Sequence, residues 1–186
     1  MRRTTILTTL LAASLSLAAC GDGSRAEAPR SAIFDGPVYA SVAELDADAD
    51  AVAIGSATAV HGRLTEGELY GAAKLGGAEG LPIALYEVQV KNTIKGAAAR
   101  TILVTRIDQR RLATAEQTVF PLHRDLMFFL RDTATTLDGM PVYSVVGMDQ
   151  GWLRIAEGRL HAVSRTNGKA GPGDGQTVVA VAASVR

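Results

Sequence analysis

The sequence has one cysteine, few aromatic residues and no net charge. The single cysteine and the balanced charge each exclude a class of protein. A single cysteine in 186 residues can form neither an internal disulfide nor a thiolate zinc cage. The 19 basic and 19 acidic residues balance, which argues against a nucleic-acid partner, because neutralising phosphates needs a basic surplus. With 47% hydrophobic and 20% charged residues the composition is still that of a folded chain, and its length suits one domain.

The first residues have the pattern of an export signal. Arg2 and Arg3 precede an apolar stretch that runs from Ile6 to Leu17. This stretch is shorter than the roughly 20 residues that a membrane-spanning helix needs. A positive start followed by a short apolar core and small residues is typical of a secretory signal peptide, which we assign to residues 1–19.

The end of this signal carries a more specific pattern. Leu17-Ala18-Ala19-Cys20 resembles the lipobox of bacterial lipoproteins, and its last position holds the chain's only cysteine. The resemblance implies cleavage between Ala19 and Cys20, a diacylglyceryl group on Cys20, and a lipid-anchored place on the extracytoplasmic side of the cell membrane. Two acyl chains suffice for stable anchoring, since each buried methylene contributes about 0.8 kcal/mol. An ordinary signal peptide with a chance cysteine is the alternative, and Gly21 leaves the choice of inner or outer membrane open.

The chain after the signal divides into a tether and a domain. Residues 20–37 are rich in small and polar residues, which predicts a flexible tether, and residues 38–186 form the predicted domain. Removal of the signal takes Arg2 and Arg3 away and leaves 17 basic against 19 acidic residues, a net charge of −2. The exported chain is therefore slightly acidic.

Hydrophobic patterns in the domain predict mostly strands. Ser41-Val42-Ala43-Glu44 has the form of a capping box and predicts a short helix to about Asp48. A strand then runs from Ala51 to Val60 with a bulge at Gly55, and the glycine-rich stretch Gly62–Leu81 is interpreted as a long loop or loose hairpin. The further predicted strands are Pro82–Ile94, Thr101–Ile107, Leu126–Leu130, Val142–Val146, Trp152–Ile155 and Arg159–Val163.

The last segment fits two structures. Val178, Val181 and Val185 recur at helical spacing, whereas valine itself favours strands. We favour a helix, with Asp174 or Thr177 as its N-cap.

Short strands with glycine turns and one or two flanking helices predict a mainly β fold, a small OB-like antiparallel barrel. Residues 49–55, the strand ending Thr93-Ile94-Lys95-Gly96 and the run Leu126–Leu130 resemble a group of uncharacterised bacterial lipoproteins. Their domain is similar to an OB-like barrel of the netrin type, which also occurs in tissue inhibitors of metalloproteinases. The resemblance covers about residues 41–163 and implies a β-barrel and a binding role. Protease inhibition does not transfer, because Cys20 lies far from the domain and is expected to be acylated.

Metal sites find little support. Asp46, Asp48 and Asp50 resemble the opening of a calcium loop, but the glycine and glutamate required at positions six and twelve are replaced by Ala51 and Ala57. An acidic helix end is the alternative. The histidines have no metal-binding spacing, so no metal and no cofactor is expected; they are His61, His123 and His161.

No catalytic residue is assigned. Ser144 and Ser164 lack the surroundings of a nucleophile elbow, and acylation of Cys20 excludes cysteine catalysis. The alternative function is a small cell-envelope hydrolase that assembles His123, Asp125 and a serine. This hypothesis needs one histidine within hydrogen-bond reach of both a serine and a carboxylate.

The binding candidates are one basic cluster and one aromatic residue. Arg106, Arg110 and Arg111 open the stretch before Phe120 and could contact anionic headgroups or cell-wall polymers, or form an ordinary solvated loop. Trp152, the only tryptophan, is either a ligand-stacking platform or a core residue. We expect a lipid-anchored, non-catalytic binding or interaction module of the bacterial cell envelope. Its partners would be the membrane and an unidentified envelope protein or polymer, not nucleic acid; an envelope spacer without a partner is a third reading.

Overall fold

A computed structural model describes residues 37–77, 79–108, 120–163, 165–166 and 169–186. The predicted signal peptide, Cys20 and almost all of the predicted tether lie outside these residues, as do Arg110 and Arg111. In the described part of the chain, no helix is long and apolar enough to span a membrane.

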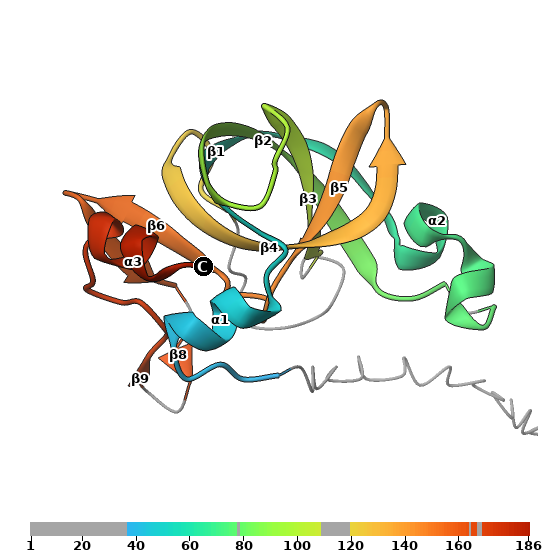
Figure 1. Ribbon diagram of the computed structural model, residues 1–186. Helices are drawn as coiled ribbons and strands as arrows, with labels where there is room; N and C mark the ends of the chain where they lie inside the picture. The colour runs from blue at the N-terminus through green and yellow to red at the C-terminus, as the bar shows by residue number, and fades with distance from the viewer. Residues whose placement is uncertain (1–36, 78, 109–119, 164, 167–168) are drawn as a thin grey trace, which may run out of the picture. The chain divides into compact units, whose positions relative to one another are not determined.

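The described residues form a mainly β domain with short helices (Figure 1). The helices are α1 (Val42–Asp48), α2 (Glu66–Tyr70), the 3-10 helix η1 (Ala72–Leu75) and α3 (Val178–Ser184). The strands are β1 (Ala51–Thr65), β2 (Pro82–Lys95), β3 (Thr101–Ile107), β4 (Asp125–Leu137), β5 (Met140–Val145), β6 (Trp152–Ala156), β7 (Arg159–Ala162), β8 (Arg165–Thr166) and β9 (Lys169–Ala170). The predicted fold class is confirmed, with one more α-helix than expected.

Five strands close into a ring. Their order is β1-β2-β3-β5-β4, and a further pairing of β1 with β4 completes the OB-like barrel, while β6 and β7 continue the sheet beyond β4. The predicted OB-like antiparallel barrel is confirmed, and it contains one parallel pair, formed by β3 and β5. An odd number of strands in a closed ring cannot alternate in direction throughout, so one parallel pair is unavoidable.

Strand β1 pairs with β2 on one side and with β4 on the other, and it bends at Gly55. Residues Ala51–Ser56 pair with β4, and the pairing with β2 shifts register between Ile54 and Gly55, which confirms the predicted bulge. A Cβ atom at Gly55 would lie 2.6 Å from the backbone oxygen of Gln89. The absence of a side chain therefore allows β2 to cross β1 closely at this bend.

We expect Gly55→Ala to lower the free energy of unfolding by about 1–3 kcal/mol, because the added methyl must displace the β2 backbone. Urea unfolding followed by circular dichroism measures the change. Gly62→Ala is the matched control in the same strand, since its Cβ atom would meet only Leu64 Cδ2, at 3.9 Å. Equal unfolding midpoints for the two variants would contradict the packing argument.

The barrel interior combines small residues on β1 with large rings from other elements. Ala51, Ala53 and Ala57 are buried on β1, and the ring of Phe120 packs among three other aromatic rings. The alanines leave the volume that these rings fill, so a chain with few aromatic residues still packs a dense core. The four rings are those of Tyr86, Phe120, Phe128 and Trp152.

Helices α1 and α3 belong to a second hydrophobic cluster, on the opposite face of β4 and β6 (Figure 1). The predicted α1 is confirmed: Ser41 caps it by accepting a hydrogen bond from the Glu44 N–H, whereas the Glu44 carboxylate accepts from Ala40. The C-terminal segment is a helix, as favoured, and Thr177 is its N-cap.

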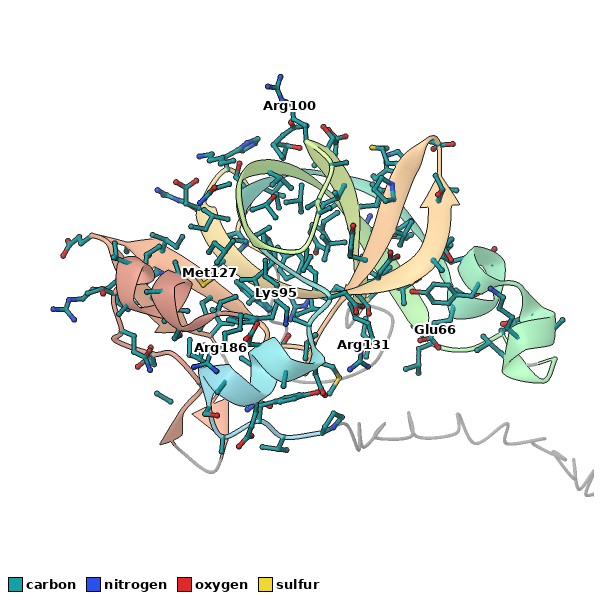
Figure 2. The ribbon with its side chains drawn as sticks, viewed as in Figure 1. Glu66, Lys95, Arg100, Met127, Arg131 and Arg186 are labelled. Carbon is teal, nitrogen blue, oxygen red and sulfur yellow. The ribbon has the colours of Figure 1, made fainter. Side chains whose placement is uncertain are left out.

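Of the two structures predicted for Gly62–Leu81, the long loop is wrong and the hairpin is confirmed, because β1 and β2 pair antiparallel with Thr65 opposite Pro82. Strand β1 continues to Thr65, which begins α2 with a complete capping box to Glu68. Tyr70 at the end of α2 is hydrogen-bonded to Thr105 of β3, and burial raises the pKa of its hydroxyl. The two ends of the connection between β1 and β2 are joined, because the Leu81 N–H donates to the carboxylate of Glu66, which is labelled in Figure 2.

Candidate functional site

Arg106 occupies a position inside the barrel where an apolar residue is expected. Strand β3 alternates, so that Ile102 and Val104 face the interior core, and Arg106 is the next residue on the same face. Its side chain is only 8% exposed. The predicted strand Thr101–Ile107 is confirmed, and the alternative of a solvated loop does not hold at Arg106, because the strand directs this side chain inward.

Two aromatic rings lie against the Arg106 guanidinium. The guanidinium carbon is 5.2 Å from the centre of the Phe120 ring and 5.5 Å from that of Trp152. The two rings themselves meet edge to face, with 4.9 Å between their centres. Contacts of a cation with such ring faces contribute about 0.5–2 kcal/mol when they are removed from water.

Asp149 balances the charge of Arg106. Arg106 Nη2–H donates a hydrogen bond to Asp149 Oδ1 and forms an ion pair with it. Asp149 lies in the turn between β5 and β6, and its side chain is 25% exposed. The neighbouring Met148 is also exposed. The buried guanidinium of Arg106 is therefore linked to solvent through Asp149 at this turn.

Two N–H donors beside these rings have no acceptor among the described residues. They are Arg106 Nη1 and Trp152 Nε1, and both are buried. Protein interiors pair most of their polar groups, and a buried donor left unpaired costs about 1–3 kcal/mol. Two such donors on neighbouring side chains mark this end of the barrel as different from the rest of the core.

This Arg106 cluster, consisting of Arg106, Phe120, Asp149 and Trp152, has the chemistry of a binding site. It combines buried hydrogen-bond donors, a compensated charge and two rings packed against the guanidinium. Its guanidinium has hydrogen-bond donors and no acceptor, so it supplies no general base. Asp149 is already engaged with Arg106.

The structure brings together two of the residues that the sequence singled out, Arg106 and Trp152. Trp152 is a core residue, 1% exposed, so its ring has no open face for stacking a ligand. Ala19, Cys20 and the remaining members of the basic cluster lie outside the described residues. Sequence reasoning missed Phe120 and Asp149, for which no spacing rule exists; Arg106 itself could have been placed inward from the alternation on β3.

His123 and Asp125, the residues of the hydrolase hypothesis, have separate partners, and so does His61. His61 Nε2 lies 2.9 Å from Asp138, and Asp125 forms an ion pair with Lys91. His123 holds a turn through its backbone N–H, which donates to the oxygen of Ala57. Within the described ranges, no hydrogen bond joins a histidine ring to a serine, and no group of histidine, cysteine and carboxylate side chains is arranged to hold a metal.

Each aspartate of the apparent calcium motif has its own structural partner. Asp46 is buried and accepts from Lys95 Nζ, at 3.0 Å, and from the backbone N–H of Arg186, also at 3.0 Å. Asp48 accepts from the Tyr39 hydroxyl at 2.6 Å, and Asp50 accepts from the backbone N–H of Asp132. Figure 2 shows Lys95 and Arg186 near α1. These partners fit the acidic-helix-end interpretation.

Comparisons with known proteins give no family for this chain. No protein-family model matches it, and no curated protein matches it significantly.

Proposed function

We propose that this chain is a non-catalytic binding module of the bacterial cell envelope, held on the extracytoplasmic side of the membrane by a lipid on Cys20. The observation that carries the binding role is a pair of buried N–H groups, on Arg106 and Trp152, that have no hydrogen-bond partner in the part of the chain that the structure describes. A core that served stability alone would gain from replacing such donors with apolar groups of the same shape. Their presence favours an acceptor supplied by another molecule.

The fold and the charge support the same proposal. Barrels of the OB type frequently bind oligonucleotides or oligosaccharides, which is an argument from fold alone. The net charge of −2 after removal of the signal argues against the first of these ligands. An envelope component is therefore the partner that we favour.

The anchor would restrict the barrel to the membrane surface. The lipobox resemblance at Cys20 supports the attachment, and a random-coil tether over residues 20–37 would reach about 20–25 Å. A domain on such a tether samples only the envelope layer next to its membrane.

We expect Cys20→Ala to abolish incorporation of labelled fatty acid, and the protein to appear in the medium or as uncleaved precursor. The reason is that Cys20 is the only sulfur nucleophile in the chain. Metabolic labelling followed by fractionation measures both effects. Ser24→Ala, four residues further along, is the control and should label normally. A lipid-labelled, membrane-bound Cys20→Ala protein would refute the anchor.

We expect detergent-solubilised envelope material to stabilise the protein against heat. A ligand at a hundred times its dissociation constant adds about 2.7 kcal/mol, which corresponds to roughly 5–10 °C in Tm. Arg106→Lys should lose most of this increase, because it keeps a positive charge beside Asp149 but removes the Nη1 donor. If no envelope fraction raises Tm, the chain is a spacer rather than a binding module.

A further inference from the structure

Two exposed apolar side chains flank the point where the predicted tether enters the domain. The tether ends at Pro37, the next residue, Val38, is 67% exposed, and Met148 in the turn between β5 and β6 is 40% exposed. Tyr39 joins the two places, because its backbone N–H and carbonyl both bond to the side chain of Gln150, in the same turn as Met148. We call Pro37, Val38 and Met148 the entry patch.

Met148 has a backbone conformation that rarely suits its residue type. The Gln150 N–H donates to the Gly147 oxygen at 3.0 Å, which closes a four-residue turn, and Met148 at the second position of this turn has a φ of 54°. Glycine and asparagine adopt this left-handed region most easily, and neither exposes a long apolar side chain to water. The choice of methionine here favours neither the turn nor solvation, which points to an apolar partner.

The charged groups beside the entry patch are already paired. Asp149, next to Met148, forms an ion pair with Arg106, and the Glu44 carboxylate accepts from the Ala40 N–H at 2.8 Å. The patch itself contains no basic residue with which to attract anionic headgroups. Its contact with a partner is therefore apolar rather than electrostatic.

We propose that the entry patch contacts the lipid bilayer and determines which face the domain turns toward the membrane. Two apolar side chains are too few to bring a free protein to a bilayer, but a chain anchored at Cys20 is already held at its surface, where a weak contact suffices. Residues 20–36 lead from the anchor to this patch, which is the first part of the domain that the anchored chain reaches. The assignment rests on the proposed anchor and adds an orientation to it.

Methionine methyl groups test the contact directly. The full exported chain, purified with its lipid from bacterial membranes and labelled with ¹³C-methyl methionine, is held at one copy per phosphatidylcholine nanodisc containing lipid spin-labelled near the headgroup. We expect strong broadening of the Met148 signal, and little change for Met127, which is fully buried, or Met140, which packs against the outer face of the barrel. Equal broadening of Met140 and Met148 would overturn the assignment.

Salt separates an apolar contact from an electrostatic one. Charge interactions at a surface are largely screened at about 0.5 M salt, whereas contacts between apolar groups are not. The broadening of Met148 should therefore persist at this concentration. Broadening that salt removes would assign the contact to charges and overturn the proposal.

Val38→Asp should reduce the broadening of Met148 by about threefold, less than a charge costs at the bilayer centre because the patch lies at the interface. Val179→Asp is the matched control. Val179 is 79% exposed on α3 and follows Val178, whose N–H donates to Gly158 at the other end of β6 from the entry patch. Thermal unfolding checks that both variants fold, and an equal loss of broadening in both would contradict the assignment.

Met148→Asn separates a surface role from a structural one. Asparagine suits a φ of 54°, so this variant should unfold at the wild-type temperature or above it, while the spin label broadens the Val38 amide signal less than in the wild type. A lower unfolding temperature would show that the Met148 side chain supports the fold, and would overturn its role as a membrane contact.

Fatty-acid labelling separates this inference from the proposed anchor. If Cys20 carries lipid and Met148 is not broadened, the orientation fails and the anchor stands. If Cys20 carries no lipid and the chain leaves the nanodiscs, both fail. If Met148 changes only when two copies share a disc, the entry patch binds a second copy of the chain, and the bilayer assignment is overturned.

Discussion

Asp149→Ala is expected to lower the free energy of unfolding by about 3–5 kcal/mol, because it leaves the buried Arg106 charge without a partner. Cation–π contacts with Phe120 and Trp152 do not replace a carboxylate. For a domain of this size the change corresponds to a fall in Tm of roughly 10 °C or more. Chemical unfolding followed by circular dichroism measures it.

The matched control is Asp125→Ala. Asp125 pairs with Lys91, but their side chains are 46% and 54% exposed. Exposed pairs contribute about 0–1 kcal/mol, so this variant should unfold close to the wild type. Adding Arg106→Met to Asp149→Ala should recover most of the loss, since the double variant removes both charges. A double variant no more stable than Asp149→Ala would show that burial of the Arg106 charge is not the cause.

The second large effect is expected at Gln150, the residue after Asp149. Gln150 is buried, and its amide accepts from the Tyr39 N–H and donates to the Tyr39 carbonyl, each at 3.0 Å. Gln150→Ala removes both partners of the Tyr39 backbone and should destabilise the domain by about 2–4 kcal/mol. The Tyr39 amide should also exchange with deuterium much faster than in the wild type.

Gln89→Ala tests whether any glutamine truncation has this effect. Gln89 is partly exposed on β2, and its hydrogen bonds join side chains only, those of Glu87 and Thr101. We expect a change of less than about 1 kcal/mol and no change in exchange at Tyr39. If Gln150→Ala and Gln89→Ala were equally mild, the contact with Tyr39 would be of little energetic importance.

Local sequence patterns predicted the strands and helices that depend on alternation of apolar residues and on helix capping. Strand β3 begins and ends where the alternation from Thr101 to Ile107 does, and Ser41 caps α1 as its sequence indicates. Helix α2 was missed although Thr65 and Glu68 form a complete capping box. The surrounding glycines outweighed that signal, and a helix of five residues leaves no periodic pattern to detect.

Long-range features were not available from pattern alone. The parallel pairing of Leu103 with Val142 follows from ring closure, which no window along the chain contains. The same holds for the Arg106 cluster, whose members come from β3, β6, the turn after β5 and Phe120 before β4. Arg106 and Trp152 were singled out for their residue types, and only the fold shows that they touch.

The pairing of β1 with both β2 and β4 also limits how fast this domain can fold. Ala51 pairs with Leu130, so the ring remains open until a strand far along the chain has arrived. Such distant contacts must overcome loop-closure entropy before they gain anything, and proteins rich in them fold slowly. Until β4 arrives, the apolar segment from Ala51 to Gly55 offers an unpaired strand edge to any neighbouring chain. Folding yield is therefore expected to fall with protein concentration, even where the finished barrel is stable.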